Sequence, residues 1–326
     1  MRKVLRAVAG AAAVAALVSL GGAAASAQAY PAKPIRWILP YPPGGGTDIM
    51  GRLVAEAISP RLGQPIVVVN QSGASGTVGS EAVRRADPDG YTLLFNASIF
   101  VLGRNVVRAA PYDPVQDFTA VARIGEVPLI LLASTKVTAG TIPEIVAAAK
   151  ADPKAYNFGL SSLGSAGHLA TLEFIRLAGT PIETITYRGA APALTDLVAG
   201  NVQLMIDPIT SLLPQAKAGR AKAVAVTSAT RSALAPDVPT TAEAGMPGLV
   251  LGSWYGVWGP KGLPAPVVDR VSRAVQEASA DPAFVEKLAT YGISPVYMGP
   301  DRFPAFMQAD IDRSVALLRA ANFQPE

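Results

Sequence analysis

A glycine-rich loop between an apolar run and an amphipathic run has the composition of an anion site. The loop reads Pro40-Tyr41-Pro42-Pro43-Gly44-Gly45-Gly46-Thr47-Asp48 and leads into a helical pattern. The first amides of a helix have no partner within the helix, and the aligned peptide dipoles place partial positive charge there. A carboxylate or phosphate can therefore bind without a cationic side chain. The same residues also fit a tight turn capped by Thr47, so this loop alone leaves two interpretations open.

A second loop of small residues has the same arrangement. It runs from Asn157 to Leu169 as Asn-Phe-Gly-Leu-Ser-Ser-Leu-Gly-Ser-Ala-Gly-His-Leu, again between a strand pattern and a helix pattern. Two such helix ends on opposite lobes of a protein could hold two anionic ends of one ligand. Glycine and serine are equally favoured in ordinary strand-to-helix turns, which is the alternative for both loops.

The first 29 residues have the layout of a cleaved secretory signal. A basic start (Arg2, Lys3, Arg6) precedes an uncharged, alanine-rich stretch and the small-x-small sites 25–27 and 27–29. An uncleaved membrane anchor is the alternative, which Gly21-Gly22 and the alanine-dominated core disfavour. We therefore predict signal cleavage and a freely soluble protein in the periplasm.

Charge and cysteine content narrow the classes of partner. The chain has 28 basic and 24 acidic residues, but three of the basic residues belong to the predicted signal, so the rest is nearly balanced. No basic patch points to nucleic acid. There is no cysteine, so neither a disulfide nor a lipid on an N-terminal cysteine is available. We expect no cofactor and no metal.

Strand-like and helical runs alternate along the chain, which is the pattern of a parallel α/β sheet. The predicted strands are 35–39, 65–69, 91–95, 128–133, 156–160, 182–187, 202–206 and 221–227. The predicted helical stripes are 49–58, 142–149, 169–177, 193–198, 267–278 and 306–318.

The domain limits are harder to predict. The proline-rich stretch 236–266 interrupts the alternation, and the helices after it have no predicted strands of their own, so we expect them to return to the first domain. We predict domain 1 from 30–124 and 228–326, domain 2 from 125–227, and chain crossings near Gly125 and Thr227. Such a chain has a cleft between two lobes that can close on a small ligand.

Six short motifs occur in the order found in one protein family. They are Tyr41-Pro42-Pro43-Gly44-Gly45 with Asp48, 70–76 (Asn-Gln-Ser-Gly-Ala-Ser-Gly), Gly164-Ser165 with His168-Leu169, 187–194 (Tyr-Arg-Gly-Ala-Ala-Pro-Ala-Leu), Pro239-Thr240 with Glu243 and Gly245, and 253–256 (Ser-Trp-Tyr-Gly). With these motifs the chain resembles the substrate-binding proteins of tripartite tricarboxylate transporters, also called the Bordetella uptake gene (Bug) family. One departure is that Gln71, Ser72 and Ser75 replace the Arg, Pro and middle Gly usual in the 70–76 loop, which leaves the role of that loop open.

The resemblance implies a fold and a function. The expected fold is an α/β, two-lobed periplasmic binding protein, a type II-like Venus flytrap with its ligand cleft between the lobes. The expected function is capture of a small carboxylate, such as a dicarboxylate or tricarboxylate, an aromatic acid or an acidic amino acid, by a monomer that passes it to membrane permease subunits. Much of the recognition is expected to come from backbone amides and ordered water. The predicted binding residues are Tyr41, Gly44, Gly45, Gly46, Thr47, Asp48, Ser161, Ser162, Gly164, Ser165, Ala166, Gly167, His168, Tyr187, Arg188 and Asp207.

Four of these side chains have a structural alternative. Asp48 complements the helix dipole and would repel an anion, so a structural role is favoured for it. His168 is either a neutral hydrogen-bond donor to a carboxylate or a buried structural residue. Arg188 could pair with a carboxylate or lie in solvent. Asp207 could receive a ligand ammonium group or cap the following helix, and capping is the favoured role.

Two other functions remain open at this stage. A serine hydrolase would have to use Ser161, Ser162 or Ser165 with His168, although no exposed nucleophile elbow is present. A ligand-sensing partner of a membrane signalling protein would share the same fold and cleft. An enzyme is not expected, because the metal, phosphate-loop and dinucleotide motifs are absent from the sequence.

Overall fold

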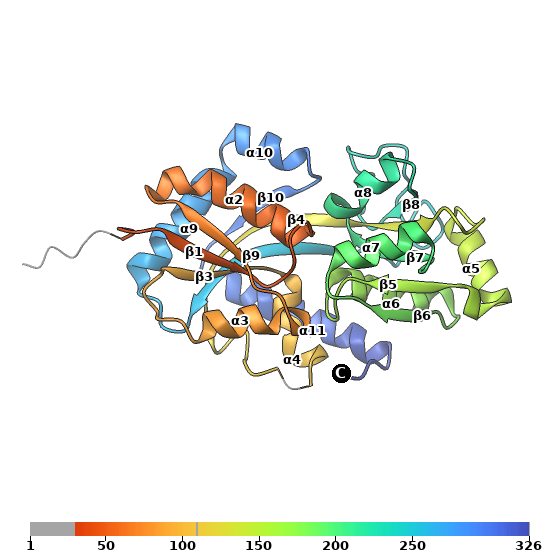
Figure 1. The fold of residues 1–326 in the computed structure, drawn as a ribbon, viewed down its shortest axis with the longest axis horizontal. Helices are drawn as coiled ribbons and strands as arrows, with labels where there is room; N and C mark the ends of the chain where they lie inside the picture. The colour runs from red at the N-terminus through yellow and green to blue at the C-terminus, as the bar shows by residue number, and fades with distance from the viewer. Residues whose placement is uncertain (1–29, 109, 326) are drawn as a thin grey trace, which may run out of the picture.

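The computed structural model describes residues 30–108 and 110–325, and the predicted signal segment lies outside them. Two lobes of strands and helices lie side by side and share a long central strand (Figure 1). No helix in the described ranges is both long enough and apolar enough to span a bilayer.

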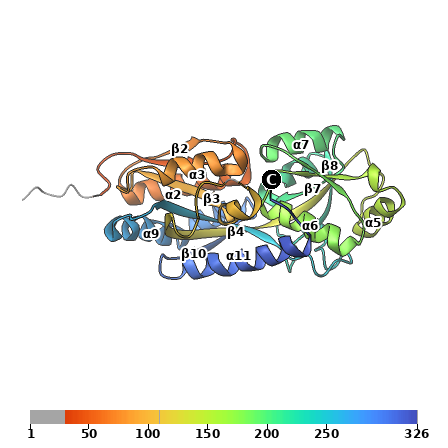
Figure 2. The same ribbon diagram turned by 90° about the horizontal axis from the view of Figure 1, so that it is seen from below.

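The first lobe contains a parallel group of strands with helices packed on both sides. Its strands are β1 (Ile35–Leu39), β2 (Ile66–Asn70), β3 (Thr92–Ala97), β9 (Gly252–Pro260) and β10 (Ser294–Met298). Its helices are α2 (Gly46–Leu62), η1 (Ala74–Gly76), α3 (Thr77–Arg84), η2 (Ser98–Leu102), α4 (Gly103–Val106), α9 (Ala265–Ser279), α10 (Pro282–Ala289) and α11 (Phe303–Ala320). In Figure 2, α11 lies below the sheet and reaches toward the second lobe.

The second lobe is built the same way from the middle of the chain. Its strands are β5 (Asn157–Leu160), β6 (Glu183–Thr186), β7 (Leu204–Pro208) and β8 (Ala221–Val226). Its helices are α5 (Ile142–Ala151), η3 (Pro153–Ala155), α6 (Ala166–Ala178), α7 (Ala190–Ala199) and α8 (Ile209–Lys217). Local signals match these boundaries: a capping box between Thr141 and Glu144 starts α5, and the Ser165 hydroxyl caps α6.

The strand β4 (Phe118–Ser134) runs through both lobes. Its first part pairs with β9 and β10, and from Leu129 onward it pairs with β7 and β8. The strand order is β2-β1-β3-β9-β4-β7-β5-β6, with β8 and β10 also on β4. The partner change between Pro128 and Leu129 therefore marks one passage of the chain between the lobes.

All eight predicted strands and all six predicted helices overlap observed elements. The prediction of a parallel sheet is wrong at its centre, because β9 is antiparallel to β3 and β4, and β4 is antiparallel to β7, β8 and β10. The helices after residue 260 also have strand partners, since β9 and β10 lie in the region predicted to lack strands.

The second passage between the lobes lies close to the first. Backbone bonds hold Thr227 to Leu129 on one side and to Leu251 on the other. The segment between them stays with the second lobe, since Thr240 forms a bridge to Val226 and the Gly248 backbone approaches Leu177 of α6. These contacts favour a return near Gly252 over one near Thr227, and the domain limits given above remain a prediction.

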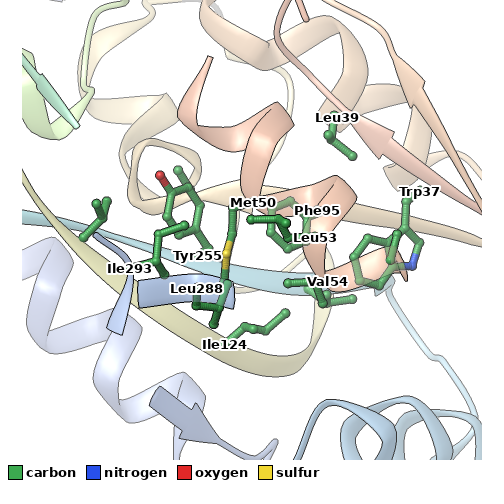
Figure 3. Close-up of a cluster of buried hydrophobic side chains, with 14 of the residues drawn as sticks. Trp37, Leu39, Met50, Leu53, Val54, Phe95, Ile124, Tyr255, Leu288 and Ile293 are labelled. Atoms are coloured by element: carbon green, nitrogen blue, oxygen red, sulfur yellow. The ribbon is translucent and has the colours of Figure 1, made fainter. Parts of the chain in front are cut away.

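A buried aromatic column runs across strands β1, β3 and β9 of the first lobe. Trp37 stacks on Phe95 with ring centroids 5.2 Å apart, and Phe95 stacks on Tyr255 at 6.2 Å. Figure 3 shows these rings beside Met50 of α2, with the Tyr255 hydroxyl at the edge of the cluster. Since Met50, Trp37, Phe95 and Tyr255 are almost fully buried, the packing fixes both the start of α2 and the direction of the Tyr255 hydroxyl.

Candidate functional site

A cavity lies between the two lobes. Loops at strand ends and helix starts of both lobes form its walls. The lining residues are Tyr41, Pro42, Pro43, Gly45, Gly46, Thr47, Ala97, Ser98, Ile99, Ser161, Ser162, Ser165, Ala166, Gly189, Ala190, Ala191, Asp207, Pro208, Ser253 and Tyr255.

The N-terminus of α2 forms one wall. Gly45 is its N-cap residue, and no side chain caps this helix end. Thr47 therefore does not cap the helix, contrary to the turn interpretation. A Cβ on Gly45 would meet no atom within 4 Å, so the space beside its backbone is open. The amides at the start of α2 have no partner within the helix, and they lie on the cavity wall with Gly46 and Thr47.

The N-terminus of α6 forms the facing wall in the second lobe. Ser165 Oγ accepts a hydrogen bond from the His168 backbone N–H at 3.0 Å, which satisfies one free amide of the helix. Ser161, Ser162 and Ala166 line the cavity beside it. The two glycine and serine loops predicted from sequence are thus brought together across the cleft.

A third helix start, that of α7, was not predicted as part of the site. Gly189 is its N-cap residue, with φ of 122° and no side-chain cap, and Gly189, Ala190 and Ala191 line the cavity. The Gly189 N–H donates to the Ser161 carbonyl at 2.8 Å, so the loops before α6 and α7 are tied together. The Tyr-Arg-Gly-Ala-Ala motif contains this helix start, but only Tyr187 and Arg188 of the motif are among the predicted binding residues.

Among the described residues that line the cavity, Asp207 is the one acidic residue, and none is a lysine, arginine or histidine. Asp207 is 4% exposed, and its carboxylate accepts a hydrogen bond from Ser161 Oγ at 3.1 Å. Burial raises the pKa of Asp207 to about 7, and the Ser161 bond opposes this only in part. The predicted capping role is wrong, because α8 starts after Pro208 and no side chain caps it.

Tyr255 reaches the cavity from β9 and was missed as a site residue. Its hydroxyl is buried and has no hydrogen-bond partner in the described part of the chain. A Cβ on Gly46 would lie 2.8 Å from this hydroxyl oxygen, so the phenol stands at the start of α2. Burial, together with the nearby Asp207, raises its pKa, and the hydroxyl remains a donor at neutral pH. The Ser-Trp-Tyr-Gly motif contained it, but a buried strand in a proline-rich region gave no sign of where it pointed.

Gly44 and Asp48, two predicted binding residues of the first loop, lie behind the cavity wall. Asp48 Oδ2 accepts from the Gly44 N–H at 3.0 Å, and Asp48 Oδ1 accepts from Asn70 Nδ2 at 2.9 Å and from Arg52 Nε at 3.0 Å. Burial alone would raise the pKa of Asp48, but these bonds lower it below its ordinary value. Asp48 therefore shapes the Gly44 turn from behind, as the structural role predicted for it requires.

The 70–76 loop supports the wall in the same indirect way. Asn70 Nδ2 also donates to the Tyr41 carbonyl, and the Tyr41 hydroxyl lies 3.4 Å from the Ser75 carbonyl. Ser75, which stands where the family has a glycine, adopts φ of 52° in the left-handed region. None of residues 70–76 lines the cavity.

Three predicted residues of the second loop are also outside the cavity. The ring of His168 is 2% exposed, its Nδ1 accepts from the Gly164 N–H at 3.0 Å, and it packs edge-on against Phe323. Burial lowers the pKa of His168 to about 4, so the ring is neutral at pH 7. A Cβ on Gly167 would lie 2.1 Å from the Ile206 carbonyl oxygen, so Gly167 permits close packing of α6 on β7.

Tyr187 and Arg188 are the remaining predicted residues outside the cavity. The Tyr187 hydroxyl donates to Asp196 Oδ2 at 2.6 Å, and burial with this carboxylate raises its pKa to about 12. The Arg188 side chain is exposed and does not line the cavity. Of the two alternatives for Arg188, pairing with a carboxylate or lying in solvent, this placement fits the second.

A serine hydrolase is not supported by this geometry. Ser161 Oγ donates to Asp207, Ser165 Oγ caps α6, and the His168 ring accepts from a backbone amide. No serine of the described loop is bonded to the imidazole, so the nucleophile and base of such an enzyme are not assembled.

The fold and the cleft define a two-lobed solute-binding protein, and comparisons with known proteins agree. Periplasmic binding protein BugD has a TM-score of 0.86 to this chain at 33% identity, covering 91% of this chain and 100% of its own. The structure of Rpa4515 from R. palustris with adipate has a TM-score of 0.88 at 33% identity over the same shares. MatC (Rpa3494) from Rhodopseudomonas palustris with bound malate has a TM-score of 0.82 at 29% identity, covering 89% of this chain and all of its own.

Residues 50–323 match the family described as tripartite tricarboxylate transporter family receptor. Protein BugT of Bordetella pertussis is 37% identical over 90% of this chain and 91% of its own length. The chain therefore belongs to the tripartite tricarboxylate transporter receptor (Bug) family, as its six motifs predicted. It is a periplasmic-type solute-binding receptor and not an enzyme.

Proposed function

We propose that this protein resides in the periplasm, binds a small carboxylate in the cleft and delivers it to the permease subunits of a tripartite tricarboxylate transporter. One observation supports this most directly. The starts of α2, α6 and α7 all reach a cavity, and the lining residues that the structure describes include no cationic side chain. Backbone amides and helix dipoles are then the groups that attract an anion.

The residues that line the cavity favour a small ligand. Prolines, alanines and Ile99 supply much of its wall, while serine hydroxyls, Tyr255 and helix amides supply the polar contacts. This mixture suits a carboxylate with a short carbon skeleton. Relatives with bound adipate and with bound malate are consistent with this proposal.

A ligand screen on the mature protein tests the binding step. Each carboxylate of a library of dicarboxylates, tricarboxylates, aromatic acids and amino acids is compared, in a thermal-shift assay, with the amide in which every carboxylate is replaced by a neutral group. A cognate acid at 100 times its dissociation constant should add about 2.7 kcal/mol to the free energy of unfolding. The amide should add little, because it lacks the charge that helix ends attract. A library in which no acid stabilises the protein would contradict the proposal.

Delivery and state of assembly need separate measurements. Uptake of the identified acid by cells with the permease subunits should depend on this protein, and the protein should elute as a monomer in multi-angle light scattering. Uptake that is unchanged without it would assign the protein to sensing and not to transport.

A further inference from the structure

A second cavity lies on the other side of strand β9 from the ligand cleft. Successive side chains of a strand point to opposite faces, and on β9 Trp254 lines the second cavity whereas Tyr255 lines the cleft. Pro128 and Thr227, which belong to the two passages between the lobes, also line the second cavity. This rear cavity therefore lies where the lobes are connected, and its shape depends on their relative orientation.

Three arginines line the rear cavity, and they come from both lobes. Arg123 lies in the part of β4 that pairs with β9 and β10 of the first lobe, and Arg313 lies on α11. Arg231 belongs to the segment after Thr227 that stays with the second lobe. Among the described residues that line this cavity, Glu126 is the one acidic residue. Positive charge therefore reaches the rear cavity from both sides of the connection.

Arg231 and Arg313 each keep N–H donors for a further acceptor. Arg231 donates through Nε to Glu243 at 2.9 Å and through Nη1 to the Pro236 carbonyl at 3.0 Å. Arg313 donates through Nη2 to Asp310. A guanidinium carries five N–H groups, so these bonds leave donors on both arginines. The carboxylates of Glu243 and Asp310 do not line the rear cavity.

Arg123 is a buried cation with an incomplete set of partners. It is 7% exposed, and its Nε has no hydrogen-bond partner in the described part of the chain. Its Nη2 donates to Glu126 Oε2 at 2.5 Å, and its guanidinium lies 4.2 Å from the ring centroid of Phe306. The Glu126 side chain is about half exposed, so this carboxylate can turn into solvent and leave the guanidinium to another anion.

The rest of the wall is largely apolar. Leu234, Ile293, Trp254 and Phe306 line the rear cavity with the arginines. An apolar wall with a few charged donors suits an organic anion, whereas an inorganic ion would leave that wall uncovered. A metal ion is a poor alternative, since no group of three acidic, histidine or cysteine ligands gathers among the described residues.

We propose that the rear cavity is a second binding site, separate from the cleft, for an amphipathic organic anion with two acidic groups. Arg231 holds one acidic group from the second lobe, and Arg123 and Arg313 hold the other from the first. The apolar body of the ligand lies against Trp254 and Phe306. Such a ligand touches both lobes beside their connection, so its binding is coupled to their relative orientation.

The direction of this coupling follows from the form in which the rear cavity is present. In this structure the lobes are in contact across the cleft, since a Cβ on Gly189 of the second lobe would lie 3.2 Å from Pro42 of the first. A ligand that binds one form of a protein better shifts the population toward that form. An occupied rear cavity therefore strengthens carboxylate binding in the cleft.

Naphthalene-1,5-disulfonate is a probe for the rear cavity, and 1-naphthol is its uncharged counterpart at pH 7.5. In isothermal titration of the mature protein the disulfonate should bind at least about tenfold more tightly than the naphthol. Arg231→Gln and Arg313→Gln should each weaken disulfonate binding at least about tenfold, because each removes a charged donor. Both side chains are at least 45% exposed, so their ion pairs add little to folding.

Two variants serve as controls. Arg319→Gln removes an exposed arginine of α11 outside the rear cavity and should bind the disulfonate as wild type does. Gly45→Val alters the cleft and should keep disulfonate binding within about threefold, because the two sites are separate. Circular dichroism shows whether each variant is folded. With saturating disulfonate, the affinity of wild type for the best acid from the carboxylate screen should rise at least about fivefold.

The outcomes separate this proposal from the proposed function. No disulfonate binding, or binding that Gly45→Val abolishes and both glutamine variants at Arg231 and Arg313 retain, would overturn the rear site. An affinity for the acid that saturating disulfonate leaves unchanged or lowers would overturn the coupling. Failure of the whole carboxylate library, with disulfonate binding still dependent on both arginines, would overturn the proposed function and support the rear site.

Discussion

Thr227 and Leu129 are bonded to each other where the two passages between the lobes lie side by side. The Thr227 N–H donates to the Leu129 carbonyl at 3.0 Å, and the Leu129 N–H donates to Thr227 Oγ1 at 3.1 Å. The same hydroxyl donates to the Leu251 carbonyl at 2.5 Å. One fully buried side chain thus joins both connecting segments, and we expect closure of the lobes on a ligand to pivot about this point.

Thr227→Val should destabilise the protein by about 1–3 kcal/mol. Valine keeps the shape but leaves the Leu129 N–H and the Leu251 carbonyl without this partner in a buried place. Urea unfolding measures the change. Thr195→Val, which removes an exposed hydroxyl bonded to the Ala191 carbonyl within α7, is the control and should cost much less. An equal effect of the two changes would contradict a special role of the connection.

Gly45→Val should weaken carboxylate binding at least about tenfold, or 1.4 kcal/mol, while the fold is kept. Gly45 has φ of −81° and open space at its Cβ, so valine is not strained but fills the cavity at the α2 amides. Isothermal titration with the best acid from the screen measures the loss.

Two variants control for this change. Gly140→Val also enters open space, but outside the cavity, and should bind normally. Arg188→Ala should stay within about threefold of wild type, since the side chain lies in solvent. A larger loss for Arg188→Ala than for Gly45→Val would show that a cation and not the backbone holds the ligand.

The sequence predicted the positions of the helices and strands better than it predicted which of them lie side by side. Hydrophobic periodicity located α2 and β1, and the glycine and serine loops correctly indicated helix starts at the cleft. Strand β9 was missed because it is buried on both faces and flanked by proline and glycine, so it lacks the alternation of a half-exposed strand. Strand direction depends on how the chain returns, which local patterns do not encode.

Local sequence patterns were also insufficient to predict which residues face the cavity. Whether a helix start faces the cavity depends on strand order, so α7 and Tyr255 were missed although their motifs were visible. His168 and Gly164 are in the predicted loop, yet their bond to each other turns them toward the protein interior. A motif thus located the loop, but packing decided which of its residues face the cavity.

Asp207→Asn should stabilise the ligand-free protein at pH 8. The pKa of Asp207 is raised from 3.8 to about 7, so its contribution to stability is greatest below the ordinary value and is lost as pH rises toward 7. The amide avoids burying this charge, and the gain at pH 8 should be on the order of 2–4 kcal/mol. Urea unfolding at pH 8 and pH 4.5 should show that the gain shrinks at the lower pH, whereas Asp237→Asn, which removes an exposed carboxylate outside the cavity, should show no such trend. A gain that does not depend on pH would contradict burial of a titrating carboxylate.

His168 should make stability depend on pH in the opposite direction. The pKa of His168 is lowered from 6.5 to about 4, so its contribution is fully present above pH 6.5 and is lost as pH falls through 4. By pH 4.5 this group alone should remove about 2–3 kcal/mol from the free energy of unfolding. His168→Asn keeps an acceptor for the Gly164 N–H but does not titrate, so the variant should lose less stability than wild type between pH 7 and pH 4.5. It will be less stable at pH 7 because it loses the contact with Phe323, and the comparison therefore concerns the difference between the two pH values, measured by urea unfolding. Since His168 is the single histidine of the chain, an unchanged difference in His168→Asn would show that its ring is solvated and free to take up a proton in the folded protein.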